Sequence, residues 1–480
     1  MKDFATRAIS TASTLGARYA DVRIIVSRNQ SIAVKNGKVE ALNDFESIGF
    51  GVRVLVGDAW GFAASAEVSA PEVDRVTALA VETARASAMV PGKPVNLGLP
   101  VTSTGRFVTH VQIDPFSVSL ESKLALLLDA DSRIRKNPGV KVSEGSVLAI
   151  RRDKIFANSE GAYVEQTIFE TGGSISATAV QGNEIQVRSY PHSFRQQGTG
   201  GWEYITDADF PGNAERIATE AVQLLTADTC PAMDTTLILG SSQLALQIHE
   251  SCGHPAELDR VYGTEAAFAG RSFLTTEKLK GFRYGSDIVN LTADSVSATG
   301  LGTFGWDDEG IPASRTPLVR DGMFAGYLMS RETASTLGMQ SNGCMRADGW
   351  NRIPLIRMTN VSLEPGTWEL DDMIADTDDG IFMETNRSWS IDDMRYNFQF
   401  GTEIGYEIRK GKRGRLLKNC TYSGITPEFW NSCDAIANGK HWKLWGTPNC
   451  GKGEPGQGAS VGHACSGARF RNVQMGVGKW

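Results

Sequence analysis

The sequence predicts an α+β fold in two parts, an N-terminal α+β domain over residues 1–228 and a β-rich C-terminal domain over residues 229–480. The chain has 480 residues, which is more than a single hydrophobic core usually supports. Segments with helical periodicity and segments with strand alternation follow one another in the first half, while the pattern beyond residue 260 is mostly that of strands. The small polar residues and the proline of 226–231 mark the expected boundary.

The first half is expected to combine helices with antiparallel strands. The helices carry apolar residues at helical spacing, and they cover residues 3–17, 71–87, 120–134 and 207–225. The strands alternate between apolar and polar residues, and they cover residues 20–26, 31–34, 48–64, 140–150, 154–158 and 162–180. Asn36 and Gly37 stand between two apolar runs, and because both tolerate positive φ they predict a tight hairpin.

The second half begins with a predicted strand over residues 235–239 and a helix for which Ser241 or Ser242 is the expected N-cap. Asp321-Gly322 between apolar runs predicts another hairpin. The other expected elements are an alternating stretch over 404–417 around a basic turn at 410–414, a short helix over 429–438 and a last strand over 468–477.

The stretch that follows residue 248 contains the strongest chemical signal. His249 and His254 lie five residues apart, and Glu250 follows the first of them directly. On a regular α-helix, positions i and i+5 point about 140° apart, too far round to share one tetrahedral ion. A single π-type turn brings them nearly into line. Gly253 and Pro255 loosen the helix here, so the sequence predicts a distorted helix end that can hold a metal ion.

Two histidines make an incomplete site, and isolated histidines in helices are usually structural. A third ligand has to come from downstream, where the candidates are Cys420, Cys433, His441, Cys450, His463 and Cys465. Cys450 lies in a glycine-rich stretch that is typical of an irregular loop, in which a thiolate can be turned toward a site. His463 and Cys465 form an H-x-C pair, which is a rival metal site. Burial is the default expectation for Cys230, Cys344, Cys420 and Cys433.

The composition argues against two classes of protein, those that bind nucleic acid directly and those that span a membrane. Net charge of −7 and a pI near 5.6 argue against direct nucleic-acid binding. No run approaches about eighteen consecutive apolar residues, so no membrane-spanning helix is expected. The first twenty residues lack the features of a signal peptide, and the seven scattered cysteines suit a reducing compartment, so a cytoplasmic location is expected.

Four blocks of sequence carry a resemblance to a known family. They are IHESCGHPAELDR, DDEGIPASRTPLVRDGMFAGYLMSRETAS, IPLIRMTNVSLEPG, and NCGKGEPGQGASVGH with ARFRNV. In this order the chain resembles the TldD/PmbA family of zinc metalloproteases, in register from about residue 235 to the C-terminus. The N-terminal half is also similar, through its NGKVE hairpin and GFGVRV. After His463 the family pattern has small residues and prolines, whereas this chain has Ala464-Cys465-Ser466.

The resemblance implies specific roles for four residues. Since HExxxH is intact, the chain looks like the catalytic TldD-type branch and not the TldE/PmbA-type branch that lacks the motif. By resemblance, His249, His254 and Cys450 are the ligands of a Zn²⁺ cofactor, and Glu250 is the catalytic base. The family's fold, with an N-terminal α+β domain and a β-rich C-terminal domain that form dimers, agrees with the prediction from the residues.

The predicted function is therefore a zinc metallopeptidase. Three protein ligands leave one open position, as in catalytic zinc sites, and a zinc-bound water would attack a peptide carbonyl with Glu250 as general base. Long alternating strands imply open sheet edges that pair with extended peptides, and shielding of these edges implies a dimer. By the resemblance, the partner is a second copy of the chain or a TldE/PmbA-like paralogue. We expect short or unfolded peptides as substrates.

Two other function classes stay open. The first is a regulatory or binding subunit of a heteromeric TldD/TldE-like protease, which would be expected to lack His249, Glu250 or His254. The second is a role like that of a gyrase modulator, against which the acidic pI counts.

Overall fold

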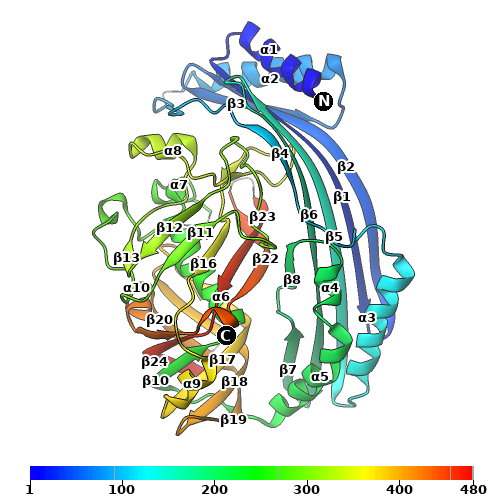
Figure 1. Ribbon diagram of the computed structural model, residues 1–480, viewed down its shortest axis with the longest axis vertical. Coiled ribbons are helices and arrows are strands. Elements are labelled where there is room, and N and C mark those ends of the chain that lie inside the picture. The colour runs from blue at the N-terminus through cyan, green and yellow to red at the C-terminus, as the bar shows by residue number, and fades with distance from the viewer. Residues whose placement is uncertain (91, 269, 454–455, 478–480) are drawn as a thin grey trace.

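The computed structural model describes residues 1–90, 92–268, 270–453 and 456–477. Its fold is α+β, as predicted, and its N-terminal half is built on one large sheet (Figure 1). Four strands of 17 to 19 residues run along this sheet: β1 (Tyr19–Lys35), β2 (Lys38–Val56), β5 (Val140–Asn158) and β6 (Tyr163–Gln181). The strand order is β3-β2-β1-β5-β6-β4, with β3 (Ala59–Ser65), β4 (Thr104–Val108), β7 (Glu184–Tyr190) and β8 (Gln196–Thr199) as the shorter members.

The long strands correct the sequence prediction in one respect. The segments expected as pairs of short strands, 20–26 with 31–34 and 140–150 with 154–158, are each one continuous strand. The polar residues that interrupt the alternation do not end these strands, because β1 and β5 are paired with each other along almost their whole length. The hairpin at Asn36-Gly37 is confirmed, because the two residues have φ of 49° and 78°. Figure 1 shows the four strands arching along one side of the C-terminal half.

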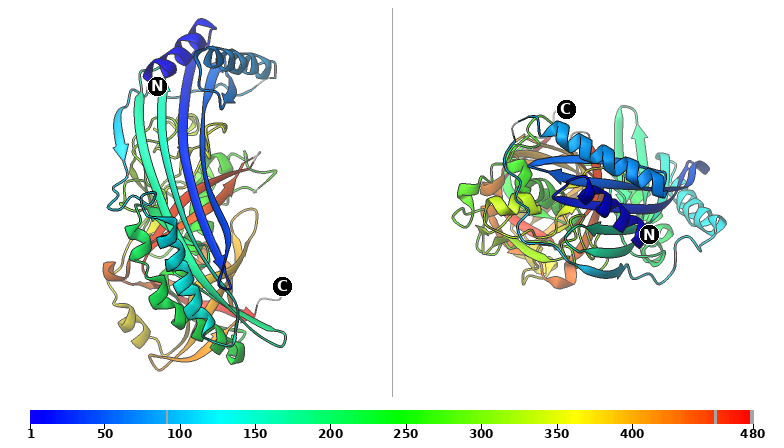
Figure 2. Two further views of the ribbon diagram at one scale, coloured as in Figure 1. Left: turned by 90° about the vertical axis from the view of Figure 1, so that its right-hand side faces the viewer. Right: turned by 90° about the horizontal axis from the view of Figure 1, so that it is seen from above.

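Helices pack on the two ends of this sheet. At one end lie α1 (Lys2–Thr14) and α2 (Ala70–Ser87), and toward the other lie α3 (Leu120–Arg135) and α5 (Phe210–Thr226), with the short α4 (Glu203–Thr206) beside them (Figure 2). The helical periodicity predicted all four longer helices. Ser69 and Ser119 cap the N-termini of α2 and α3 by accepting backbone N–H groups.

The C-terminal half contains two further large sheets with a helix between them. One sheet has the order β17-β10-β24-β20-β18-β19-β9, with β21 beside β24, and the other has the order β13-β12-β11-β16-β23-β22. Helix α6 (Ser241–Ile248) contacts β17 in the first of these sheets and β16, β22 and β23 in the second. The strand bounds are β9 (Asp228–Thr229), β10 (Met233–Leu239), β11 (Leu291–Asp294), β12 (Arg315–Arg320), β13 (Met323–Phe324), β16 (Asn360–Leu363), β17 (Asp379–Ile391), β18 (Asn397–Arg409), β19 (Lys412–Lys418), β20 (Cys420–Ile425), β21 (Cys433–Ile436), β22 (Lys443–Lys452), β23 (Gln457–Cys465) and β24 (Ala468–Val477).

Short elements complete this half. They are α7 (Leu258–Val261), α8 (Arg331–Thr336), α9 (Leu370–Ala375), α10 (Thr426–Asn431), β14 (Met345–Arg346) and β15 (Leu355–Ile356). The strand ending at Leu239, the hairpin at Asp321-Gly322, the hairpin around 410–411 and the last strand are confirmed. Among the described residues, no helix is both long enough and apolar enough to cross a membrane.

Two predictions about this half were wrong. Helix α6 begins at Ser241 with Gly240 at the N-cap, and Ser242 instead accepts a hydrogen bond from the Thr385 amide at 3.0 Å. The expected helix over 429–438 is split, because α10 ends at Asn431 and β21 then pairs with β24. The division of the chain between residues 228 and 229 stays a prediction.

Candidate metal centre

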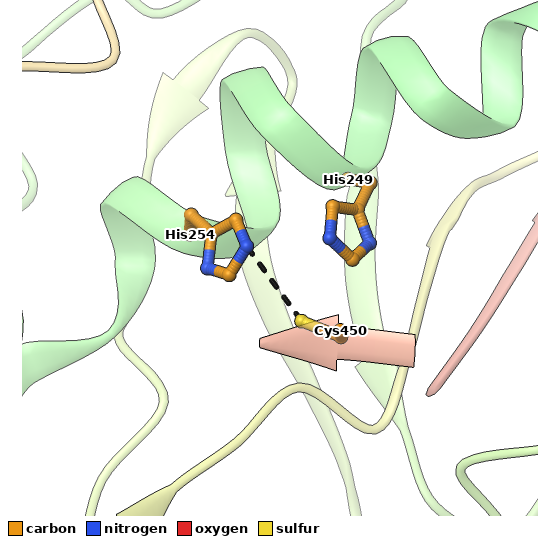
Figure 3. Close-up of side chains that lie close together, drawn as sticks. All are labelled: His249, His254 and Cys450. Atoms are coloured by element: carbon orange, nitrogen blue, oxygen red, sulfur yellow. Dashed lines mark hydrogen bonds between the residues drawn. The ribbon is translucent and has the colours of Figure 1, made fainter. Parts of the chain in front are cut away.

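The helix that carries the two histidines ends in a π-helical turn. Regular α-helical structure stops at Ile248, His249–Gly253 form the π-turn, and His254–Ala256 form a single 3-10 turn. The wider turn brings residues five apart onto one side, as predicted from their spacing. The rings of His249 and His254 lie 4.8 Å apart between centroids and perpendicular to each other, and both face the sulfur of Cys450 (Figure 3).

Contacts from distant parts of the chain hold this turn. Pro255 has no N–H to donate to the Ser251 carbonyl four residues earlier, and the Tyr284 hydroxyl donates to that carbonyl instead, at 2.8 Å. The indole N–H of Trp430 donates to the Ser251 hydroxyl at 2.9 Å. A Cβ on Gly253 would lie 2.1 Å from the Met358 sulfur, so only glycine fits here without movement of that side chain.

Cys450 comes from a strand, which corrects the expectation of an irregular loop. It lies on β22 opposite Ala459 of β23, and the pairing is irregular only between Thr447 and Cys450. Arg357 donates to the carbonyls of both Cys450 and Gln457, so one buried guanidinium ties the two strands together. Glycine in this stretch predicted a loop because glycine is rare inside strands. Glu454 and Pro455 of the quoted motif lie outside the described residues.

The donor atoms of His249, His254 and Cys450 are buried and lie within 4.8 Å of one another. Among the described residues, this is the one group of three or more histidine, cysteine or acidic side chains that could hold a metal ion. The Cys450 sulfur lies 3.6 Å from Nε2 of His254. A tetrahedral zinc ion with ordinary Zn–N and Zn–S bonds separates such ligand atoms by about 3.5 Å. Two imidazoles and one thiolate are also a donor set that suits zinc.

The ionisation of the three side chains suits a metal. Burial lowers the pKa of both His249 and His254, so that the rings are neutral at pH 7. Burial alone would raise the pKa of the Cys450 thiol, but His254 and Arg357 outweigh it and leave that pKa below its ordinary value. In contrast, burial raises the pKa of Cys465, whose thiol lies 3.3 Å from the carbonyl oxygen of Ser241. Of these two cysteines, Cys450 is therefore the one prepared to act as a thiolate.

In both His249 and His254, the ring nitrogen Nδ1 contacts a further side chain. Nδ1 of His254 lies 3.0 Å from a carboxylate oxygen of Glu257, and Nδ1 of His249 lies 2.8 Å from Nε2 of His463. Burial would raise the pKa of Glu257, but Lys452, His254 and Arg260 hold it well below its usual range. A carboxylate at this place orients a ligand histidine and increases its basicity. His463, a candidate ligand in the rival H-x-C site, thus contacts His249 and does not join Cys465 in a metal-binding group.

Glu250 is paired with an arginine from the tip of a hairpin. Its Oε2 lies 2.9 Å from Nη1 of Arg395, and both side chains are largely buried. Arg395 occupies the turn between β17 and β18 with a left-handed φ of 61°. The Thr426 hydroxyl donates to its carbonyl at 2.9 Å and holds the turn. Sequence reasoning missed this arginine because nothing local connects it to Glu250, whereas Glu257 could have been found from its i+3 spacing to His254.

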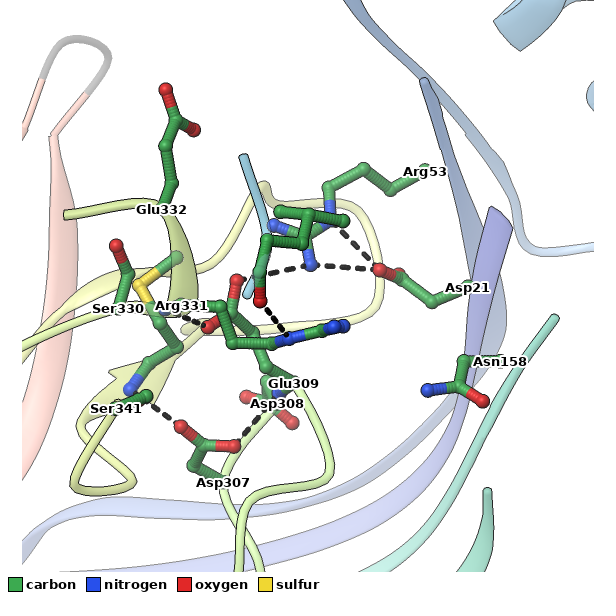
Figure 4. A network of polar contacts seen from close by, with 12 residues as sticks. Asp21, Arg53, Asn158, Asp307, Asp308, Glu309, Ser330, Arg331, Glu332 and Ser341 are labelled. Atoms are coloured by element: carbon green, nitrogen blue, oxygen red, sulfur yellow. Dashed lines mark hydrogen bonds and ion pairs between the residues drawn. The ribbon is translucent and has the colours of Figure 1, made fainter. Parts of the chain in front are cut away.

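The acidic run 307–309 forms a separate polar cluster (Figure 4). Arg53 from β2 pairs with Asp21 at 2.7 Å and with Glu309 at 3.5 Å, and Lys154 from β5 pairs with Asp308 at 2.7 Å. These carboxylates are buried against basic residues of the N-terminal sheet. The cluster therefore joins the two halves of the protein and takes no part in the metal centre.

Three family models match successive parts of the chain. Residues 20–88 match domain 1 of the PmbA/TldA metallopeptidases, residues 113–227 match their central domain, and residues 232–476 match their C-terminal domain. The chain belongs to the PmbA/TldA metallopeptidase family. A metalloprotease of Methanocaldococcus jannaschii is 30% identical to this family member over 446 residues, which cover 92% of this chain and 94% of the relative.

Two solved structures share the fold. A Thermotoga maritima protein named for DNA gyrase modulation superimposes with a TM-score of 0.78 at 18% identity, over 99% of this chain and 100% of that one. TldE from Thermococcus kodakarensis superimposes with a TM-score of 0.73 at 16% identity, over 99% of this chain and 100% of that one. At these identities the likeness establishes the fold alone.

Proposed function

We propose that this PmbA/TldA family member is a zinc metallopeptidase of the HExxxH type, with His249, His254 and Cys450 as ligands and Glu250 as general base. The observation that carries the proposal is the convergence of two neutral imidazoles and one thiol of lowered pKa at a single buried point. A zinc ion there supplies Lewis acidity and lowers the pKa of water toward neutrality. Relatives named as metalloproteases support a hydrolytic reaction.

The chain's own residues perform the proton transfers in this proposal. Glu250 directly follows His249 on the π-turn, and in this proposal its carboxylate accepts a proton from the attacking water. The same carboxyl group can return that proton to the amine that leaves. Arg395 holds one carboxylate oxygen of Glu250 at 2.9 Å and so orients the carboxylate.

We propose extended peptides, short or unfolded, as the substrates. Strand β3 covers β2 only from Phe50 to Val56, so over residues 38–49 the outer edge of β2 pairs with no other strand in the described part of the chain. An open edge can bind main chain by β-augmentation, and it needs shielding from aggregation. A homodimer, or a heterodimer with a TldE/PmbA-like paralogue, would supply that shield.

Metal-dependent cleavage tests this proposal. A protein in native and permanently unfolded form, together with short peptides from it, should be offered to the zinc-loaded and the chelator-stripped enzyme. We expect cleavage of the unfolded form and the peptides, its loss on stripping and its return with zinc. Metal-independent cleavage would contradict the proposed centre. Equal cleavage of the native form would contradict the preference for extended peptides, and a fully active monomer by light scattering would contradict the proposed dimer.

The alternatives make different predictions. A binding subunit without catalysis is expected to lack the HExxxH residues, all of which are present here. A role like that of a gyrase modulator predicts salt-dependent retention on DNA without peptide cleavage, and the pI of 5.6 argues against it. All seven cysteines are free thiols in the structure, and we propose that the enzyme works in the reducing cytoplasm.

A further inference from the structure

We infer that His463 is a positioning residue, which accepts a hydrogen bond from Nδ1–H of His249 and thereby directs Nε2 of His249 to the metal. The inference rests on the proposed zinc centre and assigns a role within it to a residue that is not itself a ligand. It predicts that His463 controls how tightly the site holds zinc while the set of atoms bound to zinc stays the same.

The direction of the hydrogen bonds between His249, His463 and the Val361 carbonyl follows from that carbonyl, which can only accept. Nδ1 of His463 lies 2.9 Å from the carbonyl oxygen of Val361, and a carbonyl can only accept. Nδ1 of His463 therefore carries a proton, and in a neutral ring its Nε2 is an acceptor. Nε2 of His463 lies 2.8 Å from Nδ1 of His249, so His249 must donate there. The lone pair of His249 is then on Nε2, the nitrogen needed by a metal.

Burial keeps His463 neutral. The residue is fully buried, and its two ring nitrogens contact the Val361 carbonyl and the ring of His249, so no carboxylate of the described residues balances a second proton on the ring. If His463 were protonated, both of its nitrogens would donate, and His249 would have to accept on Nδ1. A neutral His249 would then carry its proton on Nε2 and could not bind a metal there. His249 can therefore bind a metal through Nε2 only while His463 is neutral.

The backbone around His463 is held on both sides. Strand β23 lies between β16 and β22, and Trp445 stands opposite His463 on β22. The amide of Gly462 donates to the Thr359 carbonyl at 3.1 Å, and the amide of Ala464 donates to the Ser362 hydroxyl at 3.0 Å. A ring fixed in this way can hold His249 to one orientation, which a flexible partner could not do.

The two ligand histidines have partners of different kinds. His254 donates to the carboxylate of Glu257, which increases the basicity of the ring, whereas His249 donates to a neutral imidazole. His463 therefore acts mainly through geometry and tautomer. Its loss should weaken zinc binding by about 10–100-fold, the range found for second partners of ligand histidines.

The test compares two substitutions that separate hydrogen bonding from space filling. His463→Gln places an amide oxygen near the former Nε2 and can accept from His249, while His463→Phe keeps a ring and removes the acceptor. Zinc affinity is measured by competition with a chelator on protein whose fold is verified by circular dichroism. Cobalt substitution reports the ligand set through the thiolate charge-transfer band. His441→Phe is the control, because His441 is a histidine of the same half whose Nε2 lies 3.1 Å from Glu369 and outside the group of ligand atoms.

We expect His463→Phe to weaken zinc binding by about 10–100-fold and His463→Gln to recover most of the loss, with unchanged cobalt spectra and wild-type affinity in the control. Wild-type affinity in His463→Phe, or equal weakening in both variants, would overturn the inference. A cobalt spectrum that shows one nitrogen ligand fewer would also overturn it, since His463 would then be a ligand. Where His463→Phe does not fold, His463→Ala, which adds no atoms, takes its place.

A further variant distinguishes failure of this inference from failure of the proposed function. If Cys450→Ser leaves zinc binding unchanged, the proposed centre itself is wrong. If Cys450→Ser abolishes binding while His463→Phe does not weaken it, only the role of His463 fails.

Discussion

Two regions form the metal centre. The shape of one depends on residues that are close in sequence, and the shape of the other depends on residues that are far apart in sequence. His249, Glu250 and His254 come from one turn, and their relative placement follows from a five-residue spacing with a glycine and a proline nearby. Cys450 and His463 come from the hairpin β22–β23, and their placement depends on pairing with β16 and on Arg357. The turn presents its donors by local geometry, whereas the hairpin does so only when the whole sheet has formed. The first three predictions below each change one region and leave the other intact, and the fourth concerns the contact between them.

The largest effect is expected from Cys450→Ser in the hairpin. It removes one of three ligands, so zinc affinity should fall by more than about 100-fold, beyond the range for second partners. Cys465→Ser is the matched control, because Cys465 lies on the neighbouring strand and its thiol stays protonated. Elemental analysis of purified proteins measures zinc per chain. Loss of zinc in Cys465→Ser and its retention in Cys450→Ser would show that the metal binds at the H-x-C pair of His463 and Cys465.

Glu250→Gln in the turn should separate binding from catalysis. Glutamine has the same shape as glutamate but cannot accept the proton, so zinc should stay bound while hydrolysis falls by about 10²–10⁴-fold. The measurement is peptide cleavage at matched zinc content. Full activity of the zinc-loaded variant would show that Glu250 is not the general base.

Gly253→Ala should distort the turn itself. The added methyl would meet the Met358 sulfur at 2.1 Å, and because Met358 is buried we expect a cost of about 1–3 kcal/mol in the free energy of unfolding. Gly451→Ala in β22 is the control, since nothing lies within 4 Å of its added methyl. Urea unfolding of the metal-free proteins measures the difference. Equal stability of the two variants would show that the turn tolerates a side chain there.

A smaller effect should appear at the contact between the two regions. His192 lies 2.9 Å from the Ser242 carbonyl of α6 and packs on Trp445 of β22. Burial lowers its pKa to about 4, so its contribution to stability is present above its ordinary pKa of about 6.5 and is lost as pH falls toward 4. Between pH 7 and 5.5 the wild type should lose about 1 kcal/mol more than His192→Gln does. Identical pH dependence of the two proteins in urea unfolding would contradict this role.

The same contrast explains how far the sequence could be used for prediction. The π-turn and the hairpins at Asn36-Gly37 and Asp321-Gly322 were predictable, because spacing and positive φ are local properties. The strand character of Cys450 was not, since its glycine neighbours are typical of loops and only cross-strand pairing shows otherwise. Arg395 had no signal at all, because it reaches Glu250 from 145 residues away.

Zinc K-edge X-ray absorption of the loaded enzyme tests most directly whether the turn and the hairpin bind one ion. We predict one sulfur at about 2.3 Å and two imidazole nitrogens at about 2.0–2.1 Å from zinc. The sulfur should disappear in Cys450→Ser and persist in Cys465→Ser. A wild-type spectrum without sulfur, or a sulfur that is lost only in Cys465→Ser, would contradict the assignment of the metal to His249, His254 and Cys450.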